Sequence, residues 1–309
     1  MTVMEATVRA VYGHQAKVVS CTPSIYSTSH PIDDVVVDVG DGRTVALLRK
    51  DVAGHLPGTD AAKPAFLRDA GREQRVYRHL LARVDVGAPR LIGAGEGWLL
   101  LEKVPGVELY QVGDVGVWRA VAEAVAAMHR SFSDDAERQM ADPTLGLLRH
   151  DAVAIDGWIT LASTAFPGAS RPRWLEALRQ RYGEVRDCLL TLPQTIVHGE
   201  LYASNVLVDG ITVPPRRVCP IDWEMAALGP GLMDLAALVA GSWDDADRRA
   251  IASGYLAAFP TLGEDDLDVC RLHVAVQWLG WSTAWRPPLE HAHSWLTEAR
   301  ELGERLKLI

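Results

Sequence analysis

The sequence is poor in cysteine, lacks a long apolar run and has no excess of positive charge. Its four cysteines lie far apart, without the spacing of a metal or redox motif, so we expect buried or incidental thiols in a reducing compartment. The longest apolar stretch, Leu232–Ala240, contains Asp234 and is far too short to span a bilayer. A disulfide-rich secreted protein and a helical membrane protein are therefore both disfavoured.

The first residues carry neither a basic segment nor the apolar core of a secretory signal, so we expect a cytoplasmic protein. A net charge of −9 disfavours nucleic acid and anionic membranes as partners. It suits a cationic small ligand, although solubility alone is the simpler explanation. Internal repeats and low-complexity tracts are also lacking. A chain of 309 residues, 48% of them hydrophobic, is too long for one ordinary core and predicts a globular protein of two lobes.

What is present in the first hundred residues is the alternation of β-strands around one helix. Two β-rich runs joined by a glycine-containing turn predict a hairpin. A segment with helical spacing follows, and then two more short strands. In chain order these elements are Asp34–Val39, Thr44–Lys50, the helix 64–83, Arg90–Gly93 and Trp98–Val104. The pattern predicts a small β-rich lobe with one main helix laid across it.

After Pro105–Gly106 the pattern becomes helical. The helical segments are Val117–His129, Arg173–Leu190, Met233–Gly241, Asp245–Ala258, Asp265–Trp285 and His291–Leu308. Residues 195–222 interrupt them with short apolar runs, glycine and proline, which are typical of functional loops. We therefore predict an α+β protein with a small β-rich N-terminal lobe, residues 1–104, and a larger, mostly helical C-terminal lobe, residues 105–309.

The segment 195–222 contains oxygen-bearing side chains at a spacing that indicates a function. Glu200 comes two residues after His198, Asn205 comes five residues after Glu200, and Asp222 ends the next strand-like segment. Phosphoryl transfer needs a carboxylate near the acceptor hydroxyl and hard oxygen ligands for Mg²⁺. The spacing of His198, Glu200 and Asn205 is also that of the protein-kinase catalytic loop. These residues predict a kinase site.

The segments HGELYASNVLV and PIDWEMAALGPGLMDLA resemble the two signature stretches of the aminoglycoside phosphotransferase family, a branch of the kinase-like fold. In that family they usually have the forms H-G-D-x-x-x-x-N and I-D-W/F-E, followed by G-x-x-x-x-D-L-A. The resemblance implies a two-lobed, protein-kinase-like fold. Its N-terminal lobe, residues 1–104, would be the nucleotide-binding lobe, and its C-terminal lobe, residues 105–309, would carry the catalytic loop and the substrate site. The resemblance also implies that Glu200 takes the place of the catalytic base and that Asn205 and Asp222 are the Mg²⁺ ligands. Asp234 takes the place of an aspartate that supports the catalytic loop.

A kinase site also needs a lysine for the phosphates and a helical glutamate to hold it. Alternation along Val45–Lys50 places Lys50 on one face of the strand and Arg49 on the other, so Lys50 is the candidate. Glu73, in the helix that follows, is the candidate partner. The resemblance supports this pair, because family members carry a glutamate in a stretch like Arg72–Leu80. The alternative is two surface charges.

A loop that covers the phosphates is harder to find, because the sequence contains no G-x-G-x-x-G. The segment 24–29 offers hydroxyl and backbone N–H groups that can cradle phosphates without glycine. Its candidate residues are Ser27, Thr28 and Ser29. The resemblance supports them, since aminoglycoside kinases have a serine-containing loop at this place. An ordinary polar turn explains the segment equally well.

The nucleotide base needs a partner as well. By resemblance, LLLEKV at residues 99–104 corresponds to the hinge between the lobes, where backbone groups of Glu102 and Val104 would hydrogen-bond the purine. Backbone recognition is nearly independent of the side chains, so the choice between ATP and GTP stays open.

Acceptor residues in this fold come from the helices after the catalytic segment. Trp278, Trp281 and Trp285 are spaced three and four apart and share a helical face, which can stack on a sugar or a cation. A stripe of large core residues is the simpler interpretation. The acidic run 264–268 suits a polycationic acceptor, but such a run more often begins a solvated helix.

The predicted function is transfer of the γ-phosphoryl group of ATP or GTP, with Mg²⁺, to a hydroxyl group of an antibiotic or a related metabolite. Glu200 replaces the usual aspartate and is one methylene longer, so we expect an active enzyme with a shifted acceptor position. Two alternatives stay open, a choline- or homoserine-type metabolite kinase and a nucleotide-binding protein without activity. The retained Lys50, Glu73, Asn205 and Asp222 argue against the second. We expect a monomer or a weak homodimer.

Overall fold

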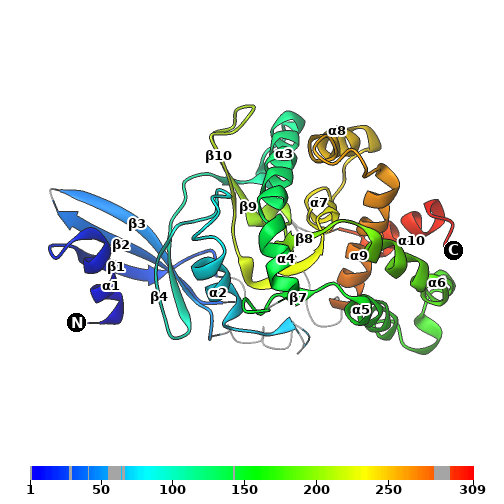
Figure 1. Cartoon of the computed structure of the whole chain (residues 1–309), viewed down its shortest axis with the longest axis horizontal. Coiled ribbons are helices and arrows are strands. Elements are labelled where there is room, and N and C mark those ends of the chain that lie inside the picture. The colour runs from blue at the N-terminus through cyan, green and yellow to red at the C-terminus, as the bar shows by residue number, and fades with distance from the viewer. Residues whose placement is uncertain are drawn as a thin grey trace.

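The computed structural model describes residues 2–27, 30–40, 42–54, 64, 67–141, 143–281 and 293–309. The molecule is elongated, with a β-sheet at the N-terminal end and a group of helices at the C-terminal end (Figure 1). Within the described ranges, no helix is long and apolar enough to cross a membrane.

A five-stranded antiparallel sheet forms the N-terminal end. In spatial order it consists of β1 (Lys17–Pro23), β2 (Ile32–Gly40), β3 (Arg43–Asp51), β5 (Trp98–Glu102) and β4 (Leu91–Gly95). β2 and β3 form the predicted hairpin. It reverses at Gly40 and Gly42, whose φ angles of 91° and 70° are readily adopted only by glycine.

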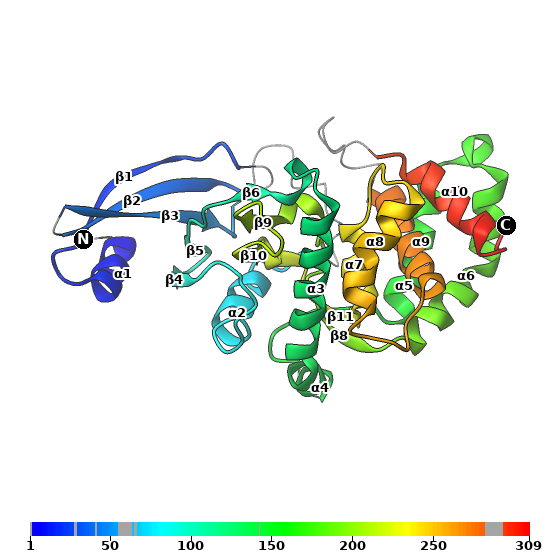
Figure 2. The ribbon, with the colours of Figure 1, turned by 90° about the horizontal axis from the view of Figure 1, so that it is seen from above.

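The helices follow the order predicted for the second half of the chain, with additions. Their bounds are α1 (Val3–Tyr12), α2 (Arg72–His79), α3 (Val115–Ser131), α4 (Ser133–Ala141), α5 (Ala152–Thr164), α6 (Arg173–Thr191), α7 (Leu232–Leu238), α8 (Asp245–Leu256), α9 (Glu264–Trp281) and α10 (Trp295–Arg305). Most of them lie together at the C-terminal end, as Figures 1 and 2 both show.

Two small three-stranded sheets lie between the large sheet and the helices of the C-terminal end (Figure 2). One has the order β10-β9-β6 and the other β7-β11-β8. Their strands are β6 (Val107–Glu108), β7 (Leu148–Arg149), β8 (Gln194–Val197), β9 (Val206–Asp209), β10 (Arg217–Pro220) and β11 (Ala227–Pro230). β8 ends before His198 and β9 begins after Asn205, so the predicted catalytic loop connects the two sheets.

Alternation along the strands of the large sheet sends side chains to two faces. Leu47 of β3 and Leu100 of β5 are buried in one cluster with Val8 of α1. Lys50 and its cross-strand neighbour Leu99 belong to the opposite face. That face contributes to the main core, which also contains buried residues of α2. The register of β3 therefore directs the lysine away from α1.

The predicted helix over 64–83 is wrong in its extent, since α2 occupies only eight of these residues. Gly71 is its N-cap, and residues 80–83 form turns. The buried guanidinium of Arg72 donates to the carbonyl of Leu67 at 3.0 Å, so the first residue of the helix holds the preceding chain in a turn.

Three helices have no counterpart in the prediction. α1 and α4 are short, with ten and nine residues. α5 is apolar around most of its circumference, which weakens the helical period. The parts of the last two predicted helices that fall on residues 282–292 lie outside the described residues. The lobe boundary at 104/105 stays a prediction.

Candidate active site

Lys50 is the centre of a buried group of charges. Its side chain is 8% exposed, and its Nζ lies 2.7 Å from Oε2 of Glu73 and 2.6 Å from Oδ1 of Asp222. Glu73, in the first turn of α2, is 3% exposed, and Asp222, which follows β10, is 30% exposed. Arg49 faces the other way and pairs with Asp33 at 2.9 Å. Three segments far apart in sequence therefore meet at one cation, and the predicted Lys50–Glu73 contact is present.

The electrostatics of this group follow from its burial. Burial disfavours the ammonium, but Asp222 and Glu73 outweigh it and raise the pKa of Lys50 well above its ordinary value. For Glu73 burial dominates and raises the pKa of the carboxyl, despite the nearby ammonium. Lys50 is thus charged at neutral pH. It can accept another anion in place of Asp222, its more exposed partner.

The loop after β8 makes a tight turn at Gly199. Its φ is +86°, and a Cβ at this position would lie 2.1 Å from the carbonyl oxygen of Met225, so only glycine fits. The ring of His198 is buried. Its Nε2–H donates to the carbonyl of Ile221 at 2.8 Å, and its Nδ1 accepts the N–H of Glu200 at 3.3 Å. Burial lowers the pKa of His198, in keeping with a neutral ring.

Glu200 is half-buried, and both of its backbone groups are held. Besides its N–H bond to His198, its carbonyl accepts from Nδ2 of Asn205 at 2.8 Å and from the N–H of Tyr202 at 2.8 Å. Burial raises the pKa of the Tyr202 hydroxyl, and the charge of Glu200 adds to that effect. The loop backbone therefore determines the point from which the Glu200 carboxylate projects.

A backbone hydrogen bond joins the segment of Asn205 to the segment of Asp222. The N–H of Ile221 donates to the carbonyl of Asn205 at 2.9 Å, which holds the end of β10 against the catalytic loop. Asp222 has φ 66° and ψ 68°, a left-handed conformation that is costly for most residues with a side chain. This backbone conformation accompanies the contact of its carboxylate with Lys50.

These two side chains offer the donors that Mg²⁺ prefers. The amide nitrogen of Asn205 is already bonded, which leaves its oxygen, and Asp222 supplies a carboxylate. Among the residues that the structure describes, no three His, Cys, Asp or Glu side chains are grouped to hold a metal. Mg²⁺ is usually held by one or two side chains together with substrate phosphates and water. The residues present therefore fit the metal that the sequence predicts.

Asp234 holds the predicted catalytic loop by accepting two of its backbone N–H groups, in the place that the resemblance implies. Its Oδ2 accepts the N–H of His198 at 2.7 Å, and its Oδ1 accepts the N–H of Gly199 at 3.0 Å. Nε2 of His129 lies 3.0 Å from the same Oδ2. Burial opposes ionisation of Asp234, but its interactions with His129 and His198, the hydrogen bond from His129 foremost, hold its pKa below the ordinary value.

The predicted phosphate-covering loop has its own internal bonding. The Ser27 hydroxyl donates to the carbonyl of Ile32 at 3.1 Å and accepts the N–H of Ile32 at 2.9 Å. The N–H of Ser24 donates to the same carbonyl at 2.8 Å. Ser27 thus shapes the loop with the hydroxyl that the prediction assigns to phosphate. Thr28 and Ser29 lie outside the described residues.

The predicted hinge is anchored through a side chain. The Glu102 carboxylate accepts two hydrogen bonds from Arg217, at 2.8 and 3.1 Å, and one from the N–H of Arg90 at 3.1 Å. The bond from Arg217 is the main reason that the pKa of Glu102 is lowered. Glu102 therefore links β5 to β10. Val104 is half-buried just beyond β5, and purine binding by this backbone stays a prediction.

Three residues at the site have no assigned role in the prediction. Nε2 of His30 lies 3.1 Å from Oε2 of Glu224, and Nδ1 of His30 lies 2.7 Å from the carbonyl of Gly54. Arg72 donates to the carbonyl of Glu224 at 2.7 Å. Glu224 is the last residue of the I-D-W-E motif, and this position in a motif was the only feature of the sequence that could have identified it as a site residue. His30 and Arg72 stand in no motif that would have pointed to a contact across so many residues.

Trp278 and Trp281 pack mainly against other aromatic rings. Trp281 is 8% exposed, and half-buried Trp278 donates its indole N–H to the hydroxyl of Tyr202. The rings of Trp278 and Trp295 stack with centroids 5.2 Å apart and planes at 4°. This arrangement favours the core interpretation for Trp281. Trp285 lies outside the described residues.

Comparison with known proteins places this geometry among phosphotransferases. Residues 34–273 match the family model described as the phosphotransferase enzyme family. Viomycin phosphotransferase of Streptomyces vinaceus is 29% identical over 201 residues, which make up 56% of this chain and 63% of that protein. The match thus spans less than two thirds of that relative.

Solved structures with the same fold have little sequence identity to this chain. The choline kinase LicA from Streptococcus pneumoniae matches with a TM-score of 0.64 at 14% identity, over 100% of both chains. The macrolide 2′-phosphotransferase MphH from Brachybacterium faecium matches with a TM-score of 0.60 at 17% identity, over 96% of this chain and 98% of that one. APH(2″)-IIia, in complex with GDP and kanamycin, matches with a TM-score of 0.60 at 15% identity over 99% of both. These matches confirm the predicted kinase-like fold.

Proposed function

We propose that this chain, which belongs to the phosphotransferase enzyme family, transfers the γ-phosphoryl group of ATP or GTP to a hydroxyl group of a small molecule. The observation that carries the proposal is the convergence of Lys50, Glu73 and Asp222 beside the loop that bears Glu200 and Asn205. Phosphoryl transfer is catalysed mainly by positioning and by charge, and this site supplies both.

Each side chain has a role in this scheme. Lys50, held by Glu73, binds phosphate oxygens of the nucleotide, and Asp222 and Asn205 would hold Mg²⁺. When bound, Mg²⁺ neutralises charge on the phosphates. The acceptor oxygen forms a bond to the γ-phosphorus as the bond to the bridging oxygen breaks. The nucleoside diphosphate leaves, and the hydroxyl proton passes to Glu200.

Glutamate at position 200 changes the reach of the base and not its chemistry. Its backbone is fixed by Asn205 and His198, so the extra methylene moves the carboxylate outward from the loop. The acceptor hydroxyl should accordingly bind slightly farther from the loop than an aspartate would require. The intact contacts around Lys50 and Asn205 support an active enzyme over a protein that only binds nucleotide.

The acceptor class follows from the relatives and from the charge. A viomycin phosphotransferase shares 29% identity with this chain, and a net charge of −9 suits a cationic acceptor. We therefore favour a basic antibiotic or a related metabolite. A choline-type amino alcohol is the second candidate, favoured by the structural match to a choline kinase along the whole chain.

A turnover screen tests the proposal. Release of nucleoside diphosphate would be measured with Mg²⁺ and either ATP or GTP. The panel would include viomycin, aminoglycosides, macrolides, choline and homoserine. Asp222→Asn is the matched control, because it retains the size of the side chain and loses the charge. Acceptor-stimulated release by the wild type, lost in Asp222→Asn, supports the proposal. Tight nucleotide binding without stimulation by any panel member supports the non-catalytic alternative.

A further inference from the structure

A chain of hydrogen bonds runs from α8 to the catalytic loop. The hydroxyl of Tyr255 lies 2.8 Å from Nδ1 of His129, and Nε2 of the same ring lies 3.0 Å from Oδ2 of Asp234. Asp234 in turn accepts the backbone N–H groups of His198 and Gly199. Tyr255, His129 and Asp234 are each only 1% exposed, so the chain of hydrogen bonds is shielded from bulk solvent.

The chemistry of these groups selects one arrangement of protons. A carboxylate only accepts hydrogen bonds, so the nitrogen of His129 that faces Asp234 must carry a proton. In a neutral imidazole the other nitrogen, Nδ1, is then an acceptor. Tyr255 presents the matching donor, and burial raises the pKa of its hydroxyl, which keeps that proton in place.

We propose that Tyr255 is a positioning residue for the phosphotransferase site. Its hydroxyl holds His129 in the tautomer whose Nε2–H binds Asp234, and Asp234 thereby fixes the N–H groups of His198 and Gly199. The inference rests on the proposed function for its effect on turnover. Its effects on the His129 ring and on the loop are independent of that function.

The surroundings of the Tyr255–His129 contact show how closely it is held. A Cβ added at Gly231, in the turn between β11 and α7, would lie 2.3 Å from the Tyr255 hydroxyl and 2.8 Å from Nδ1 of His129. The Thr195 hydroxyl donates to the carbonyl of His129 at 3.1 Å, which ties the end of α3 to β8. A side chain at position 231 would therefore collide with both partners of this hydrogen bond.

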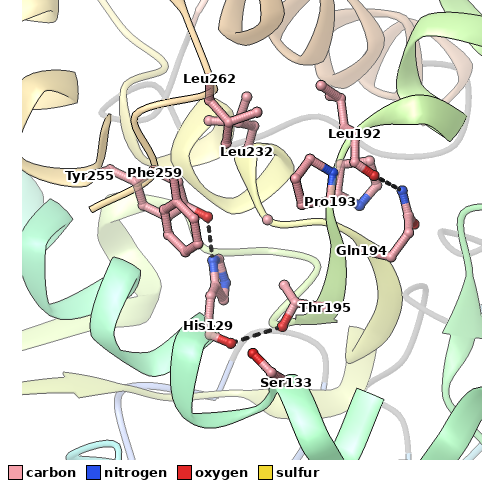
Figure 3. Close-up of a pocket in the computed structure, with 12 residues that line it drawn as sticks. His129, Ser133, Leu192, Pro193, Gln194, Thr195, Leu232, Tyr255, Phe259 and Leu262 are labelled. Carbon is pink, nitrogen blue, oxygen red and sulfur yellow. Dashed lines mark hydrogen bonds between the residues drawn. The ribbon is translucent and has the colours of Figure 1, made fainter. Parts of the chain in front are cut away.

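A cavity of about 80 Å³ opens beside the contact. Figure 3 shows the Tyr255 hydroxyl directed at the His129 ring, with Thr195 and Phe259 among the lining residues. Such a cavity has room for water. Loss of the tyrosine hydroxyl alone can therefore be compensated in part, whereas a methyl group at position 231 would occupy the place of the bond. Two variants, Tyr255→Phe and Gly231→Ala, consequently test the same contact by different means.

The same lobe offers a matched control. Tyr182 makes an equivalent buried contact, with its hydroxyl 2.7 Å from Nδ1 of His273. This pair joins α6 to α9, and within the part of the chain that the structure describes it makes no hydrogen bond to the loop after β8. Tyr182→Phe removes the same group from the same kind of partner. General loss of core stability would affect both variants, whereas positioning of the loop would change only when Tyr255 is altered.

The decisive measurement is NMR of the histidine rings and of the loop amides. In the wild type, ¹⁵N shifts should show His129 protonated at Nε2 and not at Nδ1. In Tyr255→Phe and Gly231→Ala this preference should weaken, and hydrogen exchange of the His198 and Gly199 amides should accelerate roughly five- to tenfold, the effect of one net hydrogen bond. Turnover should fall by a similar factor at unchanged nucleotide affinity, and Tyr182→Phe should change none of these quantities.

Two results would overturn the proposal. One is a wild-type His129 that is protonated at Nδ1, whether neutral or charged. The other is a Tyr255→Phe protein whose His129 ring and loop amides behave as in Tyr182→Phe. Neither readout requires turnover. If no acceptor is ever phosphorylated, the proposed function fails while the role of Tyr255 is still decided by NMR.

Discussion

Replacement of Lys50 by methionine keeps most of the side-chain volume and removes the charge. The 2.7 Å separation of Lys50 Nζ and Glu73 Oε2 sets the scale of the loss. At an effective dielectric constant of ~20, it corresponds to a Coulomb attraction of about 6 kcal/mol. Desolvation of both groups offsets much of this attraction. Removal of one partner from a buried ion pair typically destabilises a protein by about 3–5 kcal/mol.

Glu73 determines where in this range Lys50→Met should fall. Its side chain is 3% exposed, and burial already raises its pKa, so without the lysine it should take up a proton. Protonation limits the cost to the lower end, about 3 kcal/mol near neutral pH. The folded variant then binds a proton that the unfolded chain lacks, so its stability falls as pH rises. Its deficit relative to the wild type should therefore shrink as the pH is lowered toward the ordinary pKa of glutamate.

The assay is urea unfolding of the wild type, Lys50→Met, Glu73→Gln and the double variant, followed by tryptophan fluorescence at two pH values. The double variant should lose less stability than the sum of the single variants, by about 1–3 kcal/mol. Turnover of Lys50→Met should fall by at least about 10²-fold, because the phosphates lose their cation. Additive stabilities would refute the ion pair as an energetic unit. Turnover equal to that of the wild type would refute the phosphate role.

Three further predictions concern the rest of the site. Asp222→Ala should abolish turnover and weaken Mg²⁺-dependent nucleotide binding, since a metal ligand and its charge are lost. Isothermal titration with and without Mg²⁺ measures the binding, and a kcat equal to that of the wild type would contradict the prediction. Glu200→Gln should lower kcat by about 10²–10⁴-fold, the usual cost of losing a general base, at nearly unchanged nucleotide binding. Glu200→Asp should retain measurable activity. Steady-state kinetics of both variants test this, and a Glu200→Gln protein with normal kcat would exclude Glu200 as the base. Burial lowers the pKa of His30, but the hydrogen bond to Glu224, the charge of Glu224 and the bond to Gly54 together outweigh it and leave the pKa raised. The stability from this contact is therefore present below about pH 6.5 and is lost as pH rises through the higher folded-state value. Thermal unfolding of His30→Gln should thus differ from that of the wild type more at pH 6 than at pH 8, and an equal difference at both would exclude the effect.

The core of the site was predictable because it rests on local rules. Strand alternation in β3 separates Lys50 from Arg49, and the structure places Lys50 in the buried group and Arg49 against Asp33. The spacing from His198 to Asn205 likewise encodes a single loop between two strands. Such features depend on the period of a strand or on a short motif, and both are visible in one sequence.

The parts that could not be predicted depend on contacts between distant segments. The bond between His30 and Glu224 joins residues 194 positions apart, and neither periodicity nor spacing announces it. The sequence also does not determine the hydrogen-bond partner of the Ser27 hydroxyl, because a serine in a polar loop can bind either a ligand or the nearby backbone, as it does here at Ile32. Arg72, the first residue of α2, is likewise held by the carbonyls of Gly146 and Glu224, which are 74 and 152 positions away, and no helical pattern contains these bonds.

The destination of the phosphoryl group tests the central claim most directly. The protein would be incubated with Mg²⁺ and γ-¹⁸O-labelled ATP or GTP in the presence of viomycin or another acceptor that stimulates turnover. Mass spectrometry and ³¹P NMR of the products would then locate the label. A labelled phosphate ester on an acceptor hydroxyl is expected with the wild type and not with Asp222→Ala. Label found only in inorganic phosphate, at a rate that no acceptor changes, would contradict the claim.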